Sequence, residues 1–193
     1  FDSHLLWQEP YVIYSQILAE KAPTYQHYGL HVDWTTLGGF FQRLEKQGIG
    51  INVGMYVGAA TVREMVLGYA DTTPDAAQLA RMQALVAQAM RDGARGVSTA
   101  LQYPPAPYAH TDELVALAST ASQHGGIYAT HMRSEGETEM AALDETFRIA
   151  REAHIPVEIF HLKSAGKANW GTMPRVVARI DSARRSGLDI AAD

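Results

Sequence analysis

The sequence predicts an α/β fold, a partial (β/α)8 barrel of the TIM type with about five βα units. Short apolar strand signals recur in its second half, and their starts lie 32, 30 and 31 residues apart. Each interval has the length of one strand and one helix. Such alternation gives a parallel sheet with right-handed crossovers, and the regular unit favours a barrel over an open doubly wound sheet. The four predicted strands are Arg95–Leu101, Ile127–His131, Val157–Leu162 and Leu188–Asp193.

Amphipathic helices are expected between these strands, because apolar residues recur there at helical spacing. Thr111 is expected to cap the first of them, ahead of two acidic first-turn residues. The predicted buried faces are Leu114, Leu117 and Ala121, then Met140, Leu143, Phe147 and Ala150, then Val176, Ile180 and Ala183. Helix ends are predicted at three glycines that precede strands, Gly93, Gly125 and Gly187.

A fifth unit is expected upstream, where Ile51–Val57 reads as a strand after a helical stretch at Phe40–Gln47. A helix should follow it through Leu79, Met82, Val86 and Met90. Residues 1–34 form an irregular or helical segment with a possible helix near Tyr11–Lys21, and residues 35–193 form the central part of the barrel domain.

Five units cannot close an eight-stranded barrel, and neither Phe1 nor Asp193 resembles a natural terminus. We therefore expect a fragment.

The amino-acid composition limits the classes of partner and metal site that the chain can have. The 16 basic and 21 acidic residues give a net charge of −5 without a basic stripe, so nucleic acid is not an expected partner. No apolar run approaches the roughly 20 residues that cross a bilayer. With no cysteine, any metal site must use histidines and carboxylates. The compartment and the oligomeric state stay open on these grounds, and a cytoplasmic location is the working expectation.

Two histidines stand at the predicted ends of consecutive strands, His131 and His161. Chemistry in a parallel barrel lies at the C-terminal ends of the strands. Regular alternation would place Ile127, Ala129 and His131 on one face, and likewise Val157, Ile159, His161 and Lys163. Both imidazoles could then bind one metal ion, or each could be a buried strand-end residue bonded to backbone. The residues alone leave both interpretations open.

Two longer runs resemble strand-end motifs of the N-acyl-D-amino-acid deacylases, the D-aminoacylase branch of the amidohydrolase superfamily. These runs are Thr130–Glu135 and His161–Gly171, the latter containing His-x-Lys and then Gly-x-x-Asn-Trp-Gly. The stretch Gly93–Leu101, with Tyr103 and two prolines after it, is similar to the preceding strand and loop. The likeness is good over residues 93–193 and weaker over 33–69.

The resemblance implies a barrel of the metal-dependent hydrolase kind, in which zinc-activated water cleaves the amide bond of an N-acyl-D-amino acid. It implies zinc ligation by His131 and His161, and binding of the substrate carboxylate by Lys163 and Tyr103. Arg133 could orient a ligand or the substrate, or could form a surface salt bridge.

Other parts of the family pattern are not identifiable. The family also uses a His-x-His pair, a metal-binding cysteine and a general-base aspartate on a later strand, which is expected beyond residue 193. His4 follows Asp-Ser as in that pair, but the second ligand is absent, so we treat it as coincidence. Asp193 is expected to give packing or polar support. A fragment without these groups could be inactive.

Three alternatives remain at this stage. The chain could come from another amidohydrolase, such as a D-hydantoinase or a dihydroorotase-like enzyme. Lys163 could instead be a Schiff-base nucleophile. A third possibility, from another class, is a barrel that binds an acidic small molecule without turnover.

Overall fold

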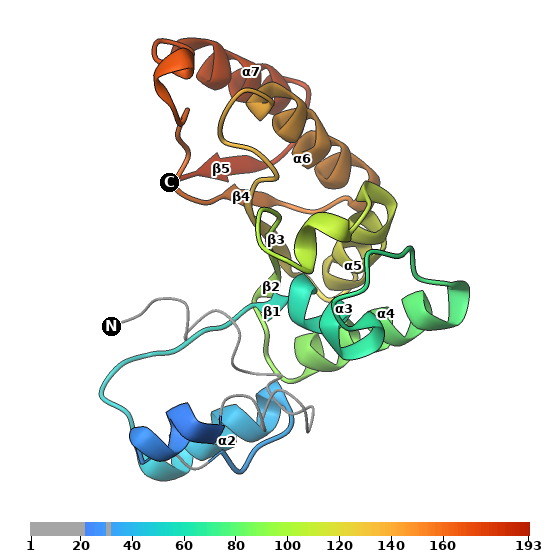
Figure 1. Cartoon of the computed structure of the whole chain (residues 1–193), viewed down its shortest axis with the longest axis vertical. Coiled ribbons are helices and arrows are strands. Elements are labelled where there is room, and N and C mark those ends of the chain that lie inside the picture. The colour runs from blue at the N-terminus through green and yellow to red at the C-terminus, as the bar shows by residue number, and fades with distance from the viewer. Residues whose placement is uncertain (1–21, 30–31) are drawn as a thin grey trace.

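The fold is a parallel sheet whose strands are neighbours in the order in which they occur in the chain. The computed structural model describes residues 22–29 and 32–193 (Figure 1). Its five strands pair in the order β1-β2-β3-β4-β5, every pair parallel. A doubly wound sheet would reverse direction at a switch point, whereas a barrel adds strands in sequence. The predicted partial barrel is confirmed. The strands are β1 Val57–Gly58, β2 Gly96–Ala100, β3 Ile127–His131, β4 Val157–Ile159 and β5 Ile190–Ala192.

Apart from a helical turn at residues 22–27, the helices of the described residues are α2 Leu37–Gln47, α3 Ala59–Leu67, α4 Ala76–Arg91, α5 Thr111–Ser122, α6 Glu139–Ala153 and α7 Met173–Arg185. The helices from α3 onward connect the strands and pack along one side of the sheet, whereas α2 precedes β1 and lies apart from the strands (Figure 1). Two 3-10 turns, Ala106–Tyr108 and Lys167–Asn169, lie in the loops after β2 and β4.

The apolar faces predicted for α4 to α7 lie mostly in the core. The prediction for the start of α5 was off by one residue. His110 occupies the N-cap position and Thr111 is the first helical residue, with its hydroxyl donating to Glu145 at 2.8 Å. The three glycines predicted to follow helix ends, Gly93, Gly125 and Gly187, have φ of +106°, +72° and +95°. Such positive values favour glycine after a helix.

The strand register decides which side chains face the helices. Tyr128 pairs with Val157 and Thr130 with Ile159, and all four side chains are buried against the helices. The alternate pair, Ala129 and Glu158, therefore points to the other side of the sheet. The hydrophobic core lies between the sheet and the helices that cover it, and it includes buried residues of all five strands.

The predicted strand at Ile51–Val57 is wrong for most of its length. Pairing with β2 begins only at Val57, and residues 51–56 are irregular. Ile51 is 74% exposed and Val53 is 40% exposed, so these β-branched residues have no sheet surface to pack on. Strand propensity largely reflects such packing, and without it the composition does not produce a strand.

The expected helix near Tyr11–Lys21 and the residue His4 fall outside the described residues. Within the described ranges, no helix is both long enough and apolar enough to cross a membrane.

Candidate metal site

The two predicted metal ligands lie in contact at the C-terminal edge of the sheet. His131 is the last residue of β3, and His161 follows β4 by two residues. Their ring centroids are 4.6 Å apart, and Nδ1 of His131 lies 2.9 Å from Nε2 of His161. The two nitrogens of one zinc site are similarly close, since Zn–N bonds measure about 2.0–2.1 Å. The structure thus brings together two residues that are thirty positions apart.

His161 does not reach this position by regular alternation along a strand. In register, Val157 and Ile159 face the helices, so regular alternation would send His161 to that side and His131 to the other. The predicted shared parity is therefore wrong. β4 ends at Ile159, and His161 has φ of +41°, in the left-handed region that non-glycine residues seldom adopt. This turn of the backbone carries the imidazole back to His131.

Asp193 supports this turn. Its Oδ1 accepts a hydrogen bond from the His161 backbone N–H, and its carbonyl accepts one from Leu162 N at 2.8 Å. Its own N–H donates to the Ile159 carbonyl at 3.1 Å. Three hydrogen bonds therefore hold the backbone that leaves β4, which is the polar support expected of Asp193.

Glu135 is the third member of the cluster, and the sequence interpretation assigned it no role. Its side chain is only 9% exposed, and Oε1 lies 2.9 Å from Nδ1 of His161. Oε2 lies 3.9 Å from Nε2 of His131. One sequence signal could have pointed to it. Two histidines and a lysine converging on one edge require a nearby acceptor, and Glu135 lies four residues after His131 in the motif.

Lys163 joins the same cluster from the loop after β4. Its ammonium Nζ donates to Oε1 of Glu135 at 2.6 Å and lies 3.1 Å from Nδ1 of His161. The side chain is half-exposed. A cation therefore stands beside the two imidazoles, at a place that an anionic ligand can reach.

The residues present fit a metal ion. One atom each of His131, Glu135 and His161 can serve as a ligand, and these atoms lie within 4.8 Å of one another. Nε2 of His131 is buried and has no hydrogen-bond partner among the described residues, which is costly for a polar atom unless something else binds it. Burial lowers the pKa of His131, and His161 and Lys163 lower it further against the opposing effect of Glu135. The neutral imidazole that a metal requires is thereby favoured.

Tyr103 and Arg133 occupy different positions relative to this cluster. The Tyr103 ring lies 5.5 Å from the His131 ring, centroid to centroid, and its side chain is exposed. Arg133 points elsewhere. Its guanidinium donates twice to Glu145, at 2.8 and 2.9 Å, and to the carbonyls of Pro107 and Ala109 at 2.9 and 2.8 Å. Of the two roles considered for Arg133, orienting a ligand or forming a salt bridge, this geometry favours the salt bridge.

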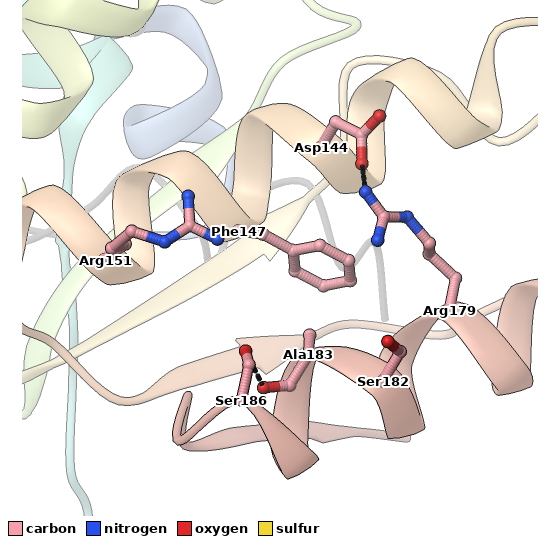
Figure 2. Close-up of a pocket in the computed structure, with 7 residues that line it drawn as sticks. All are labelled: Asp144, Phe147, Arg151, Arg179, Ser182, Ala183 and Ser186. Carbon is pink, nitrogen blue, oxygen red and sulfur yellow. Dashed lines mark hydrogen bonds and ion pairs between the residues drawn. The ribbon is translucent and has the colours of Figure 1, made fainter.

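A groove of about 300 Å³ lies elsewhere, between α6 and α7 (Figure 2). The Arg179 guanidinium lies 5.6 Å from the centre of the Phe147 ring and is paired with Asp144. None of the clustered residues lines this groove, so it is separate from the candidate site. Its lining residues are Asp144, Phe147, Arg151, Arg179, Ser182, Ala183 and Ser186.

Comparison of the sequence with characterised proteins gives consistent results. No family model matches the chain. A D-aminoacylase from Alcaligenes xylosoxydans xylosoxydans is 43% identical over 133 residues, which are 69% of this chain and 28% of that protein. An N-acyl-D-glutamate deacylase from the same organism is 36% identical over 154 residues, or 80% of this chain and 32% of that protein. The chain thus spans about a third of the length of these relatives.

Comparison with solved structures gives the same kinds of relative as the sequence comparison. A D-aminoacylase described as defining a novel subset of amidohydrolases superimposes with a TM-score of 0.78 at 37% identity, covering 82% of this chain and 34% of that one. An N-acyl-D-glutamate deacylase from Bordetella bronchiseptica, solved with zinc and a phosphonate mimic of the tetrahedral intermediate, also gives 0.78, at 31% identity. It covers 84% of this chain and 35% of that one.

Proposed function

We propose that this chain, which belongs to the D-aminoacylase branch of the amidohydrolase superfamily, contributes to a metal-dependent site that hydrolyses the amide bond of N-acyl-D-amino acids. The products would be a carboxylate and a D-amino acid. The observation that carries the proposal is the cluster of His131, His161, Glu135 and Lys163 at the C-terminal ends of β3 and β4. Barrel enzymes place their chemistry at this edge.

His131 and His161 are proposed to hold zinc. Bound there, zinc would act as a Lewis acid that activates water and polarises an amide carbonyl. The chain's part is to present two imidazoles at a fixed spacing: the lowered pKa of His131 favours its neutral form, and hydrogen bonds hold the turn at His161. No residue of this sequence is proposed as the general-base aspartate.

Lys163 and Tyr103 are proposed to bind the substrate. The ammonium of Lys163 lies next to the proposed ligand His161, so it can pair with the carboxylate of an N-acyl amino acid. The ring of Tyr103 lies beside that of His131, and its hydroxyl is proposed to donate to the same carboxylate. Fixing the carboxylate orients the amide over the ligands and lowers the entropic cost of reaction.

A cytoplasmic location, and the assignment of residues 35–193 to the barrel domain, stay predictions.

The central test is replacement of each proposed ligand in the full gene product. We expect His131→Ala and His161→Ala to abolish both zinc binding and the release of D-amino acid from N-acetyl-D-amino acids. The control is His124→Ala, which removes an exposed histidine in the turn after α5. N-acetyl-L-amino acids serve as the substrate control. Turnover that persists in either ligand variant would reject the assignment, and full activity on the L substrates alone would reject the substrate class.

A further inference from the structure

We propose that Arg133 is a positioning residue, which holds the loop after β2 in place and thereby keeps Tyr103 beside the proposed metal ligand His131. This loop comprises residues 101–110 and contains the 3-10 turn Ala106–Tyr108. Arg133 acts through the loop and does not itself bind the substrate. The inference rests on the proposed function for the role of Tyr103 in binding the substrate carboxylate.

The Arg133 guanidinium holds an acidic side chain and the loop at the same time. Its Nε and Nη2 donate to the two carboxylate oxygens of Glu145 on α6, at 2.8 and 2.9 Å. Its Nη1 and Nη2 donate to the loop carbonyls of Pro107 and Ala109, at 2.9 and 2.8 Å. The Glu145 side chain is only 12% exposed. Because the guanidinium is planar, this bidentate pair also fixes the direction of the N–H groups that reach the loop.

The same carboxylate is bonded to the end of the loop by a second route. Thr111, the first residue of α5, donates its hydroxyl to Oε1 of Glu145 at 2.8 Å. That oxygen also accepts from Nη2 of Arg133. Glu145 therefore connects the end of the loop to α6 through both Arg133 and Thr111.

Tyr103 lies between two attachments of the loop to the segment after β3. Near the start of the loop, Nε2 of Gln102 donates to the carbonyl of Met132 at 3.2 Å. Near its end, Arg133 holds the two carbonyls. Between these points the Tyr103 carbonyl accepts a hydrogen bond from Ala106 N at 3.0 Å. The backbone of Tyr103 is thus bonded to the turn that Arg133 holds.

Holding the backbone matters because the Tyr103 side chain is 53% exposed. Its ring lies 5.5 Å from the His131 ring, centroid to centroid. Arg133 follows His131 by two residues, so one short segment provides a proposed metal ligand and also holds the loop that carries Tyr103. A hydroxyl that shifts relative to the ligand would no longer meet the substrate carboxylate in the orientation that places the amide for attack.

Amide hydrogen exchange on the full gene product, measured by mass spectrometry, tests whether Arg133 holds the loop. The amide hydrogens of Ala106 and Ala109 are hydrogen-bonded within the loop. Arg133→Lys keeps the charge but cannot replace the four hydrogen bonds. We expect exchange in residues 102–110 to become about 10-fold faster or more, the effect of losing one charge-assisted hydrogen bond. Unchanged exchange in Arg133→Lys would overturn the proposal.

A double-mutant cycle on KM tests whether Arg133 acts through Tyr103. Tyr103→Phe removes the hydroxyl and should raise KM for N-acetyl-D-amino acids by about 10-fold or more, the effect of losing a hydrogen bond to a charged group. Arg133→Lys should raise KM by about 3- to 10-fold, since it displaces that hydroxyl without removing it. In a Tyr103→Phe background, Arg133→Lys should add less than about 2-fold.

Equal fold-increases in KM in the two backgrounds would overturn the proposal, because Arg133 would then act on the substrate directly or through general loss of structure. Arg148→Lys is the matched control, an exposed arginine of α6 that pairs with Asp112 and Glu152. It should change neither loop exchange nor KM.

If Arg133→Lys does not fold, as far-ultraviolet circular dichroism would reveal, Glu145→Gln takes its place. It removes the carboxylate that orients the guanidinium, so exchange should again be faster and KM higher, with the KM effect absent in the Tyr103→Phe background. No change in either measurement would overturn the proposal. If Tyr103→Phe leaves KM unchanged, or the parent protein has no turnover, the proposed function fails at that point, and the exchange data decide whether Arg133 holds the loop.

Discussion

Lys163 has contacts with His161 and Glu135 that suit a group for substrate binding. Lys163→Ala removes a charge-assisted hydrogen bond to the substrate carboxylate, an interaction worth about 1.5–3 kcal/mol. Because that contact exists in both the ground and transition states, we expect KM to rise by roughly 10- to 100-fold with a smaller change in kcat. Steady-state kinetics on N-acetyl-D-amino acids would measure this, with Lys167→Ala, an exposed lysine of the same loop, as control.

An unchanged KM across all acylated D-amino acids would exclude Lys163 from carboxylate binding. The Schiff-base alternative is tested on the same protein. Borohydride treatment in the presence of substrate should leave Lys163 unmodified, whereas a trapped covalent adduct at this residue would favour the nucleophilic role.

Arg133 is predicted to stabilise the fold around the site. Arg133→Lys keeps the charge but cannot reproduce four hydrogen bonds to Glu145, Pro107 and Ala109. We expect the free energy of unfolding to fall by about 2 kcal/mol, the scale of a lost charge-assisted bond. Urea denaturation would measure it, with Arg148→Lys on the exposed face of α6 as a near-neutral control. A variant of unchanged stability and raised KM would instead place Arg133 at the substrate.

The residues of the site could be predicted only where a strand end marks them. His131 and His161 follow apolar strands, and their positions were evident from the sequence. The direction of His161 was not, because it depends on a left-handed φ that a period-two pattern does not contain. Glu135 was missed for a related reason. Its contact with Lys163 joins residues 28 positions apart across two loops, and no local pattern encodes that distance.

At the scale of elements, β2 and β3 approach closely enough to require glycine at position 96. A Cβ built on Gly96 would lie 1.9 Å from the Ile127 carbonyl oxygen, and its φ is +154°. We expect Gly96→Ala to push the two central strands apart and to cost at least about 3 kcal/mol of stability. Gly125→Ala is the matched control, since the φ of Gly125 is +72° but no atom of the described part of the chain lies within 4 Å of a Cβ built there.

The control separates backbone strain from steric clash. Gly125→Ala should cost only about 1–2 kcal/mol, the penalty for a left-handed alanine. Thermal and urea unfolding of both variants would give the difference. Equal losses would mean that the approach of β2 to β3 adds nothing beyond the backbone conformation.

Elements whose apolar residues recur at a regular spacing were predictable, and elements that depend on contacts with distant parts of the chain were not. β3 begins and ends at the predicted residues, because it pairs with a neighbouring strand on each side and is flanked in the sequence by helices with apolar faces. Val157–Leu162 was too long, since the turn at His161 ends β4 early. The α3 helix was not predicted. It begins directly after the two-residue strand β1, and its central residue Arg63 is buried in an ion pair with Glu113 on α5 at 2.5 Å.

For the molecule as a whole, the order of strands places the site at the junction of two βα units. His131 and Glu135 come from the unit that starts at β3, and His161 and Lys163 from the unit that starts at β4. A metal ion bound by both histidines would cross-link those units. Such an ion binds the folded chain and not the unfolded one, so its binding free energy adds to stability.

Zinc should therefore raise the melting temperature of the 193-residue chain. At a free zinc concentration of 100 times Kd, the expected gain is about 2.7 kcal/mol. For a chain of this size, that corresponds to a rise of about 5–10 °C. His131→Ala and His161→Ala should each remove the effect, because either change leaves only one of the two βα units with a histidine that can bind the ion. His124→Ala should retain the effect. Magnesium, which prefers oxygen ligands, should give a much smaller rise. Equal zinc responses in all four chains would mean that zinc binds elsewhere on the protein, since stabilisation through β3 and β4 requires both histidines.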